Sequence, residues 1–160
     1  AYKPAAFFKG IVLPMCEQRC ALQPAAIVCS VMQKVSLPAV HVAACLYKLA
    51  GMPLSGASIL FMRTLVMKKH ALPYKTLDAL ADYLCGFTTV DGPMPVIWHQ
   101  TVLVLAQHYK TELTRAQKDR LKALLRAHTH PKITPEIRRE LFTSICRGEP
   151  RIAEVEMMDA

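Results

Sequence analysis

The clearest candidate for a metal site is a pair of cysteines near the start of the chain. Cys16 and Cys20 are four residues apart, so a helix would present both thiols on one face, and His41 could add a third ligand. Zinc sites use four ligands that come in recognisable pairs, and the sequence contains no Cys-x-x-Cys and no His-x-x-x-His. We therefore expect buried, reduced thiols of an intracellular protein, and no metal ion.

A pair of carboxylates could support acid–base chemistry. Asp78 and Asp82 are four residues apart in a predicted helix, so they share a face. No basic or nucleophilic residue lies nearby in the sequence at a spacing that suggests a catalytic group. The sequence favours a solvated helix face whose charge is balanced by Lys75 or by a neighbouring helix.

The histidines give two further candidates. His128 and His130 flank the predicted end of a helix, where the negative end of the helix dipole stabilises a histidine. In the segment Trp98-His99-Gln100, the tryptophan fits an apolar stripe. The two polar residues lie off that stripe, where they could bind a ligand or cap a neighbouring helix. We expect structural roles for both groups.

Signatures of catalysis and of phosphate-binding loops are missing from the sequence. The six glycines form neither Gly-x-Gly-x-x-Gly nor a P-loop, and there is no Gly-x-Ser-x-Gly or His-Glu-x-x-His. These absences predict a protein that is not an enzyme and that uses no cofactor.

The distribution of charge is uneven along the chain. The net charge is +8, and residues 1–77 contain nine Lys or Arg against one acid, Glu17. Residues 110–139 contain nine against three acids, whereas residues 149–160 contain one against four. A basic body with an acidic tail predicts a polyanionic partner, and the alternative is a soluble protein that is basic without one.

Three groups of basic residues are candidates for contacts with a phosphate backbone. One surrounds the turn at Pro73, one runs at i, i+4, i+8 along a predicted helix, and one lies outside the apolar stripe of the last helix. Each group alone is typical of a solvated helix face. Exposed aromatic residues for base stacking are not evident, so base-specific recognition is not expected. The candidate RNA- or partner-binding residues are Arg63, Lys68, Lys69, Lys75, Lys118, Lys122, Arg126, Arg138 and Arg139.

The elements that carry these residues are expected to be helices. Prolines divide the chain into pieces of helical length, and the apolar spacing between them is helical rather than alternating. Ser55 and Thr134 are expected to cap helices, and Thr114 forms a capping box with Gln117. The expected helices span residues 2–12, 23–34, 38–50, 55–69, 74–87, 95–110, 114–127 and 134–146.

The fold class that follows is all-α. Short connectors predict stacked antiparallel helical hairpins in an α-solenoid (HEAT-like) architecture, with a compact all-α bundle as the alternative. Residues 23–34, 38–50 and 55–69 are apolar on most sides, which predicts burial by neighbours on both flanks. No membrane span is expected, because proline, histidine and glutamine interrupt the longest uncharged run, 92–109.

The length of 160 residues suits a single domain. We expect a helical-repeat scaffold domain over residues 1–148, as the C-terminal part of a longer protein. An acidic C-terminal tail is expected over residues 149–160, whose Glu154 or Glu156 could pair with Arg139.

Several stretches of the chain resemble the C-terminal region of the bystin family. They occur in order and together cover most of the sequence. They are YKPAAFFKGI (2–11), SVMQKVSLPAVHVAACLYKLAGMPLSGAS (30–58), KKHALPYKTLDAL (68–80), MPVIWHQTVLVLAQHYK (94–110), KITPEIRREL (132–141) and a trailing RGE (147–149).

This resemblance implies a non-catalytic assembly factor of the nascent 40S ribosomal subunit that supports 18S rRNA precursor processing and pre-40S maturation. The implied partners are pre-18S rRNA, small-subunit ribosomal proteins and other pre-40S assembly factors, with no membrane and no small-molecule substrate. The implied location is the nucleolus and nucleus, with cytoplasmic passage on pre-40S particles. The alternative is a helical-repeat protein-interaction scaffold without direct RNA contact.

Overall fold

The computed structural model describes residues 4–17 and 22–148, and within these ranges the chain is all-α. This confirms the predicted fold class at the level of secondary structure. The expected acidic tail lies outside the described residues. The elements are α1 (Pro4–Phe7), η1 (Phe8–Val12), α2 (Leu13–Glu17), α3 (Leu22–Lys34), α4 (Ala39–Leu49), α5 (Gly56–Met67), α6 (Tyr74–Cys85), η2 (Gly86–Thr89), α7 (Val96–Tyr109), η3 (Lys110–Glu112), α8 (Arg115–Ala127) and α9 (Thr134–Phe142).

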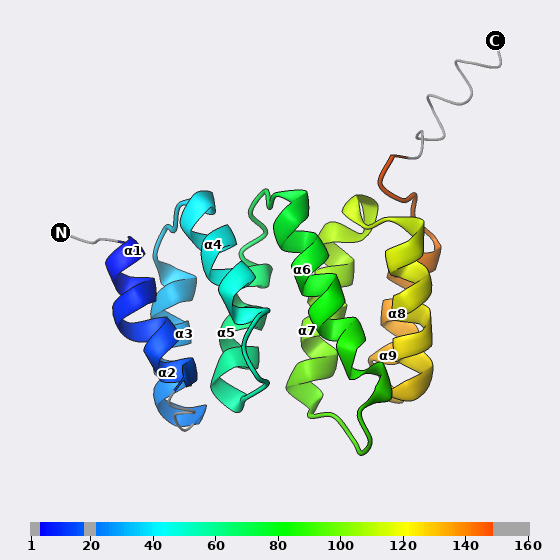
Figure 1. Cartoon of the computed structure of the whole chain (residues 1–160), viewed down its shortest axis with the longest axis horizontal. Helices are drawn as coiled ribbons and strands as arrows, with labels where there is room; N and C mark the ends of the chain where they lie inside the picture. The colour runs from blue at the N-terminus through cyan, green and yellow to red at the C-terminus, as the bar shows by residue number, and fades with distance from the viewer. Residues whose placement is uncertain (1–3, 18–21, 149–160) are drawn as a thin grey trace, which may run out of the picture.

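The longer helices form two rows. Helices α3, α5, α7 and α9 pack in that order in one row, and α4, α6 and α8 pack in that order in the other. Figure 1 shows the rows one in front of the other, with the chain alternating between them from one end of the molecule to the other. Each helix therefore has its main neighbours two helices away in the chain. None of the described helices is long and apolar enough to cross a membrane.

Local signals in the sequence explain where most helices begin. Ser55 and Thr114 both form capping boxes, with Ser58 and Gln117 respectively, as was predicted for Thr114. Thr134 is not the cap of α9. It is the first helical residue, and its hydroxyl accepts a hydrogen bond from the backbone N–H of His130 at 2.8 Å, which tightens the turn before the helix.

The first helical segment extends beyond the predicted residues 2–12, through Pro14 to Glu17. A proline inside a helix cannot donate to the carbonyl four residues earlier. Here the preceding turn is a π-helix, in which the N–H of Leu13 donates to the carbonyl of Phe8, five residues back. The wider turn lets the chain pass the proline and remain helical.

The core lies between the two rows, and α5 and Trp98 are at its centre. Nearly every residue of α5 is buried, and Trp98 is fully enclosed. Burial on both flanks is therefore confirmed for α5. It is wrong for α3 and α4, because Ile27 is 63% exposed and Val40 is 77% exposed, and both lie on helix faces that no described element covers.

Buried, reduced thiols were expected, and the structure places four of the cysteines in the interior without a disulfide. Cys29, Cys45, Cys85 and Cys146 are buried and form no disulfide. Burial raises the pKa of the Cys29 and Cys85 thiols, which keeps them protonated. The side chain of Cys16 and the whole of Cys20 fall outside the described residues.

Candidate nucleic-acid interface

Arg63 and Lys68, two of the predicted binding residues, are engaged inside the molecule. The Arg63 guanidinium donates from Nη1 to Gln100 Oε1 at 2.5 Å, which links α5 to α7. The Lys68 ammonium donates to the carbonyl oxygens of Met32 at 2.7 Å and Val35 at 2.9 Å, and so satisfies the C-terminal end of α3. Both cations therefore join neighbouring helices.

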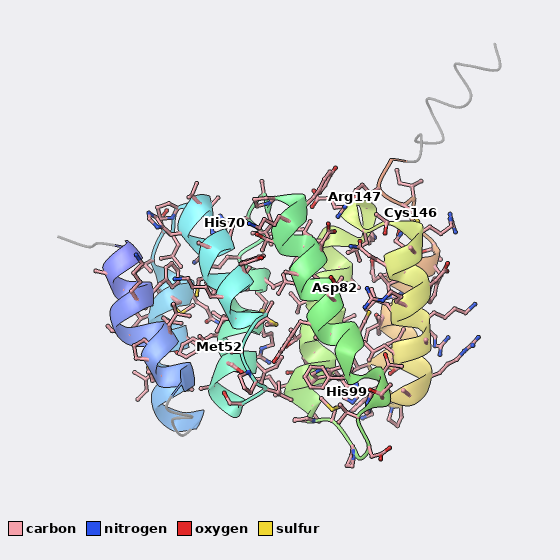
Figure 2. The ribbon with its side chains drawn as sticks, in the orientation of Figure 1. Met52, His70, Asp82, His99, Cys146 and Arg147 are labelled. Carbon is pink, nitrogen blue, oxygen red and sulfur yellow. The ribbon has the colours of Figure 1, made fainter. Side chains whose placement is uncertain are left out.

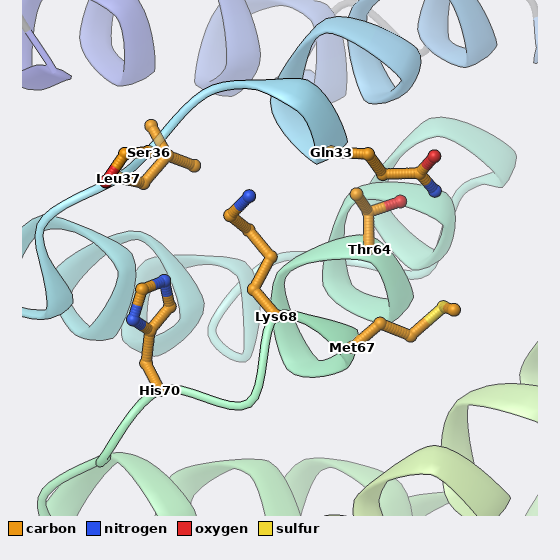
Figure 3. Close-up of a pocket in the computed structure, with 7 residues that line it drawn as sticks. All are labelled: Gln33, Ser36, Leu37, Thr64, Met67, Lys68 and His70. Atoms are coloured by element: carbon orange, nitrogen blue, oxygen red, sulfur yellow. The ribbon is translucent and has the colours of Figure 1, made fainter.

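Lys68 also lines a pocket of about 530 Å³ between the ends of α3 and α5. Figure 3 shows its ammonium pointing toward the connection that follows α3, with the His70 ring directed to the same side. Lys68, the lysine that lines this pocket, already donates its hydrogen bonds to the backbone carbonyls of Met32 and Val35.

Lys69 and Lys75 lie on either side of the turn at Pro73 and are both exposed. Lys69 adopts a left-handed backbone conformation with φ of 60°. Burial, and to a smaller extent the charge of Lys69, lowers the pKa of the nearby His108. The Lys75 ammonium lies 4.8 Å from the centroid of the Tyr47 ring. Within the described residues, no carboxylate lies within ion-pair distance of either lysine.

The predicted basic row on α8 is interrupted. Lys118 is only 3% exposed, whereas Lys122 and Arg126 are exposed. The reason is the helical period, since Lys118 precedes Leu121 by three residues and Leu125 by seven and so shares their buried stripe. Lys118 is therefore not part of an exposed basic row.

The two arginines of α9 have different surroundings. Arg139 donates from Nη2 to Glu136 Oε2 at 2.6 Å, one turn earlier on the same helix. Arg138 is half-buried and pairs with no acid among the described residues. The tail acids Glu154 and Glu156, considered as partners for Arg139, lie outside the described residues.

The negative charges of the predicted acid pair on α6, Asp78 and Asp82, are balanced by groups from neighbouring elements, as the sequence predicted. Asp78 Oδ1 accepts from Gln117 Nε2 at 2.6 Å and from Arg147 Nη2 at 2.9 Å. The hydrogen bond from Arg147 is the main reason why the pKa of Asp78 lies below its usual value. Asp82 pairs with Arg120 of α8 at 2.5 Å. Figure 2 labels Asp82, and also Arg147 in the segment that follows α9.

The predicted histidines come together around Trp98. His128 Nε2 lies 2.7 Å from the carbonyl oxygen of Phe87, and the His99 and His130 rings are 5.5 Å apart. Burial, followed by the charges of His130 and His128, lowers the pKa of His99. These rings border a pocket of about 440 Å³, but no described trio of His, Cys, Asp or Glu is placed to hold a metal. The contacts support the structural roles expected for these residues.

Exposed aromatic residues are present, contrary to the sequence-based expectation. Tyr47 is 45% exposed, Tyr74 is 54% exposed, and Phe142 is also exposed. Each carries a cation over its ring, from Lys75, Arg147 and Lys122 respectively. One signal was available for Tyr47, since the buried stripe of α4 runs through positions 42, 45, 46 and 49 and leaves residue 47 off it.

Comparison with known proteins assigns the family. The family model described as Bystin matches residues 1–151. Bystin of Homo sapiens and bystin of Nematostella vectensis are each 48% identical to this chain over 147 residues, which is 91% of the chain. Bystin of Drosophila melanogaster is 43% identical over 159 residues, or 99% of the chain. The chain belongs to the bystin family.

The chain matches only part of these relatives. It covers 34% of the human and Nematostella proteins and 35% of the Drosophila protein. It therefore spans about a third of the length of the curated relatives.

Proposed function

We propose that this chain is a non-catalytic part of an assembly factor of the nascent 40S ribosomal subunit. It supports 18S rRNA precursor processing and pre-40S maturation by binding rRNA phosphates and partner proteins. Membership of the bystin family supports this proposal. The observation that carries the RNA contact is the exposed, acid-free position of Lys69 and Lys75 at the turn between α5 and α6.

The position of the acids explains why these two lysines remain available. Apart from Glu17, every acid of the chain is at position 78 or later, and the ion pairs of the described residues all use acids from this later part. Cations between α3 and the start of α6 have no such neighbour among the described residues. A phosphate backbone supplies the missing negative charge and releases its counterions on binding.

The two-row arrangement favours an α-solenoid of the HEAT-like kind. Packing between helices two apart repeats along the molecule, so each hairpin contacts its neighbours and the exposed surface is extended. Such a surface suits a scaffold that touches rRNA at one place and ribosomal proteins or assembly factors at another. The corresponding locations are the nucleolus and nucleus, with cytoplasmic passage on pre-40S particles.

A protein-interaction scaffold without direct RNA contact is the second candidate. The observation that favours it is the pair of exposed apolar side chains Ile27 and Val31, one turn apart on α3, and Val40 of α4 is exposed as well. Neighbouring exposed apolar side chains such as those on α3 suit contact with a protein partner. Small-subunit ribosomal proteins and pre-40S assembly factors are the partners that this candidate would share with the first.

A salt titration tests the RNA contact. The wild-type chain and the variant Lys69→Gln/Lys75→Gln are titrated with a fragment of the small-subunit rRNA precursor and with an unrelated structured RNA of equal length. We expect the affinity of the wild type to fall as salt rises, with little preference between the RNAs. The double variant removes two lysine–phosphate contacts, so its slope of log affinity against log salt should be smaller by about 2, or about 1 for each contact.

The matched control is Arg120→Gln, which removes one exposed positive charge that Asp82 already neutralises. This variant should keep the wild-type slope. If the wild type binds neither RNA at near-physiological salt, the RNA contact is refuted and the protein scaffold becomes the better account.

A further inference from the structure

Two tyrosine–cation pairs lie at the start of α6, one reaching to α4 and the other to the segment after α9. Lys75 lies over the ring of Tyr47, 4.8 Å from its centroid, and the Arg147 guanidinium lies 3.9 Å from the centroid of the Tyr74 ring. Tyr74 and Lys75 are consecutive at the beginning of α6, so both pairs lie at the same end of this helix, although consecutive side chains on a helix point in different directions. We call these four residues, Tyr47, Lys75, Tyr74 and Arg147, the tyrosine–cation strip.

The two cations of the strip have different roles. Arg147 is held by three groups, since it donates to Asp78 at 2.9 Å and to the carbonyl of Glu112 at 2.7 Å and also stacks on Tyr74. Its charge is neutralised, and it fixes the orientation of the tyrosine. Lys75 is exposed and has no acid partner among the described residues, so its charge is available to an anion.

The chemistry of the strip restricts what it can recognise. The face of an aromatic ring carries a partial negative charge, which repels a carboxylate but stacks well on the flat, polarised ring of a nucleobase. An ammonium beside such a ring can bind the phosphate that joins two bases. The combination of exposed rings and an unneutralised cation therefore favours a nucleotide chain over an acidic peptide.

Duplex RNA does not fit this surface as well as a single strand. In a duplex the bases stack on each other, and their faces are inaccessible to a protein ring. A single strand presents its base faces to the tyrosines and its phosphates to Lys75 at the same time. We infer that the tyrosine–cation strip binds single-stranded RNA, with bases stacked on Tyr47 and Tyr74 and a phosphate at Lys75. This inference rests on the proposed function and narrows its ligand to an unpaired segment.

The test compares three ligands of equal length on the full chain: an oligouridylate, an abasic oligonucleotide with the same phosphate charge, and an RNA duplex. The variants are Tyr47→Leu and Tyr74→Leu, which remove a ring, and Tyr47→Phe, which keeps one. The matched control is Val96→Ala, which trims an exposed apolar side chain at the start of α7 and leaves every ring and cation of the protein in place.

We expect Tyr47→Leu and Tyr74→Leu each to weaken binding of the oligouridylate by between about 5-fold and about 150-fold. Neither variant should change the affinity for the abasic oligonucleotide or the duplex, because these ligands offer phosphates without accessible bases. Tyr47→Phe and Val96→Ala should bind the oligouridylate as the wild type does. Unchanged circular dichroism and duplex affinity show that a variant is folded.

Two results would overturn the inference, and they can be told apart. If the wild type binds RNA but the leucine variants bind the oligouridylate unchanged, stacking is refuted and the phosphate contact of the proposed function stands. If the wild type binds none of the three nucleic-acid ligands and instead binds an acidic peptide, both the inference and the proposed RNA contact are refuted.

Discussion

The ammonium of Lys118 in α8 lies against the segment that follows α9, 2.9 Å from Ser144 Oγ and 3.0 Å from the carbonyl oxygen of Ile145. Both acceptors lie beyond Phe142, where α9 ends, and the buried ammonium supplies them with a hydrogen-bond donor. Lys118 thus fastens this segment to α8, although its spacing in the sequence suggested an RNA contact.

The variant Lys118→Met should therefore destabilise the fold without changing RNA binding. Methionine retains the apolar stem but leaves the hydroxyl of Ser144 and the carbonyl of Ile145 without their donor, which costs about 1–3 kcal/mol. Urea denaturation measures the free energy of unfolding. The control Lys122→Met changes an exposed lysine of the same helix and should stay within about 0.5 kcal/mol of the wild type. Equal stability of the two variants would contradict the assigned role.

Lys122 and Arg126 remain exposed on α8 and stay candidates for phosphate contacts. If both bind phosphates, the variant Lys122→Gln/Arg126→Gln should reduce the slope of log RNA affinity against log salt by about 2, or about 1 per neutralised cation. Lys118→Met serves as the comparison, since it removes a charge from the same helix at a buried position. A slope that stays at the wild-type value in the double variant would exclude α8 from the interface.

The pair formed by Asp78 and Arg147 should make stability depend on pH in the acid range. Because the folded-state pKa of Asp78 is lowered, its contribution is present above the unfolded value of about 3.9 and is lost as the pH falls through the folded value. The carboxylate is 43% exposed, so solvent limits the effect to about 1 kcal/mol or less.

A double-mutant cycle isolates this pair. Asp78→Asn and Arg147→Met should each lower the free energy of unfolding near neutral pH, and the double variant should lose less than the sum of the two. The coupling should shrink as the pH is lowered below about 3.9. Strict additivity at neutral pH would show that the 2.9 Å contact contributes nothing to stability.

His99 should also couple stability to pH, in a higher range. Its folded-state pKa is lowered by burial and by His130 and His128, so the folded protein prefers the neutral ring. Its contribution is fully present above the unfolded value of about 6.5 and is lost as the pH falls below that value toward the folded pKa.

The variant His99→Phe keeps an aromatic ring beside Trp98 and cannot be protonated. Its thermal midpoint should fall less than that of the wild type on acidification from about pH 7.5 to about pH 5.5. Parallel curves for the two proteins would contradict this account.

The sequence allowed most helices to be predicted because their signals are local. The boxes at Ser55 and Thr114 and the prolines before α4, α6 and α7 are written within a few residues of each helix start. The segment through Pro14 departed from prediction because a π-turn, which the sequence does not announce, accommodates the proline.

The contacts that individual Lys and Arg side chains make could not be predicted, because their partners lie far away in the chain. Lys68 meets carbonyls 33 and 36 residues earlier, and Arg63 meets an amide 37 residues later. The balancing of Asp78 and Asp82 by a neighbouring helix was foreseen in kind, but the particular partners Gln117, Arg147 and Arg120 emerge only from packing.

The capping box at the start of α8 gives a last prediction that concerns stability alone. The Thr114 hydroxyl accepts from the N–H of Gln117 at 3.2 Å, and Gln117 Oε1 accepts from the N–H of Thr114 at 2.9 Å. Thr114→Ala removes the first of these bonds and should lower the free energy of unfolding by about 1 kcal/mol. Thr111→Ala, at an exposed position just before the helix, should have no measurable effect. Helix α8 also carries Lys122 and Arg126, the candidate phosphate contacts, and both variants keep these cations. Under conditions in which both variants are fully folded, their RNA affinity should therefore match that of the wild type. A loss of affinity in Thr114→Ala under those conditions would mean that the start of α8 itself contacts the RNA.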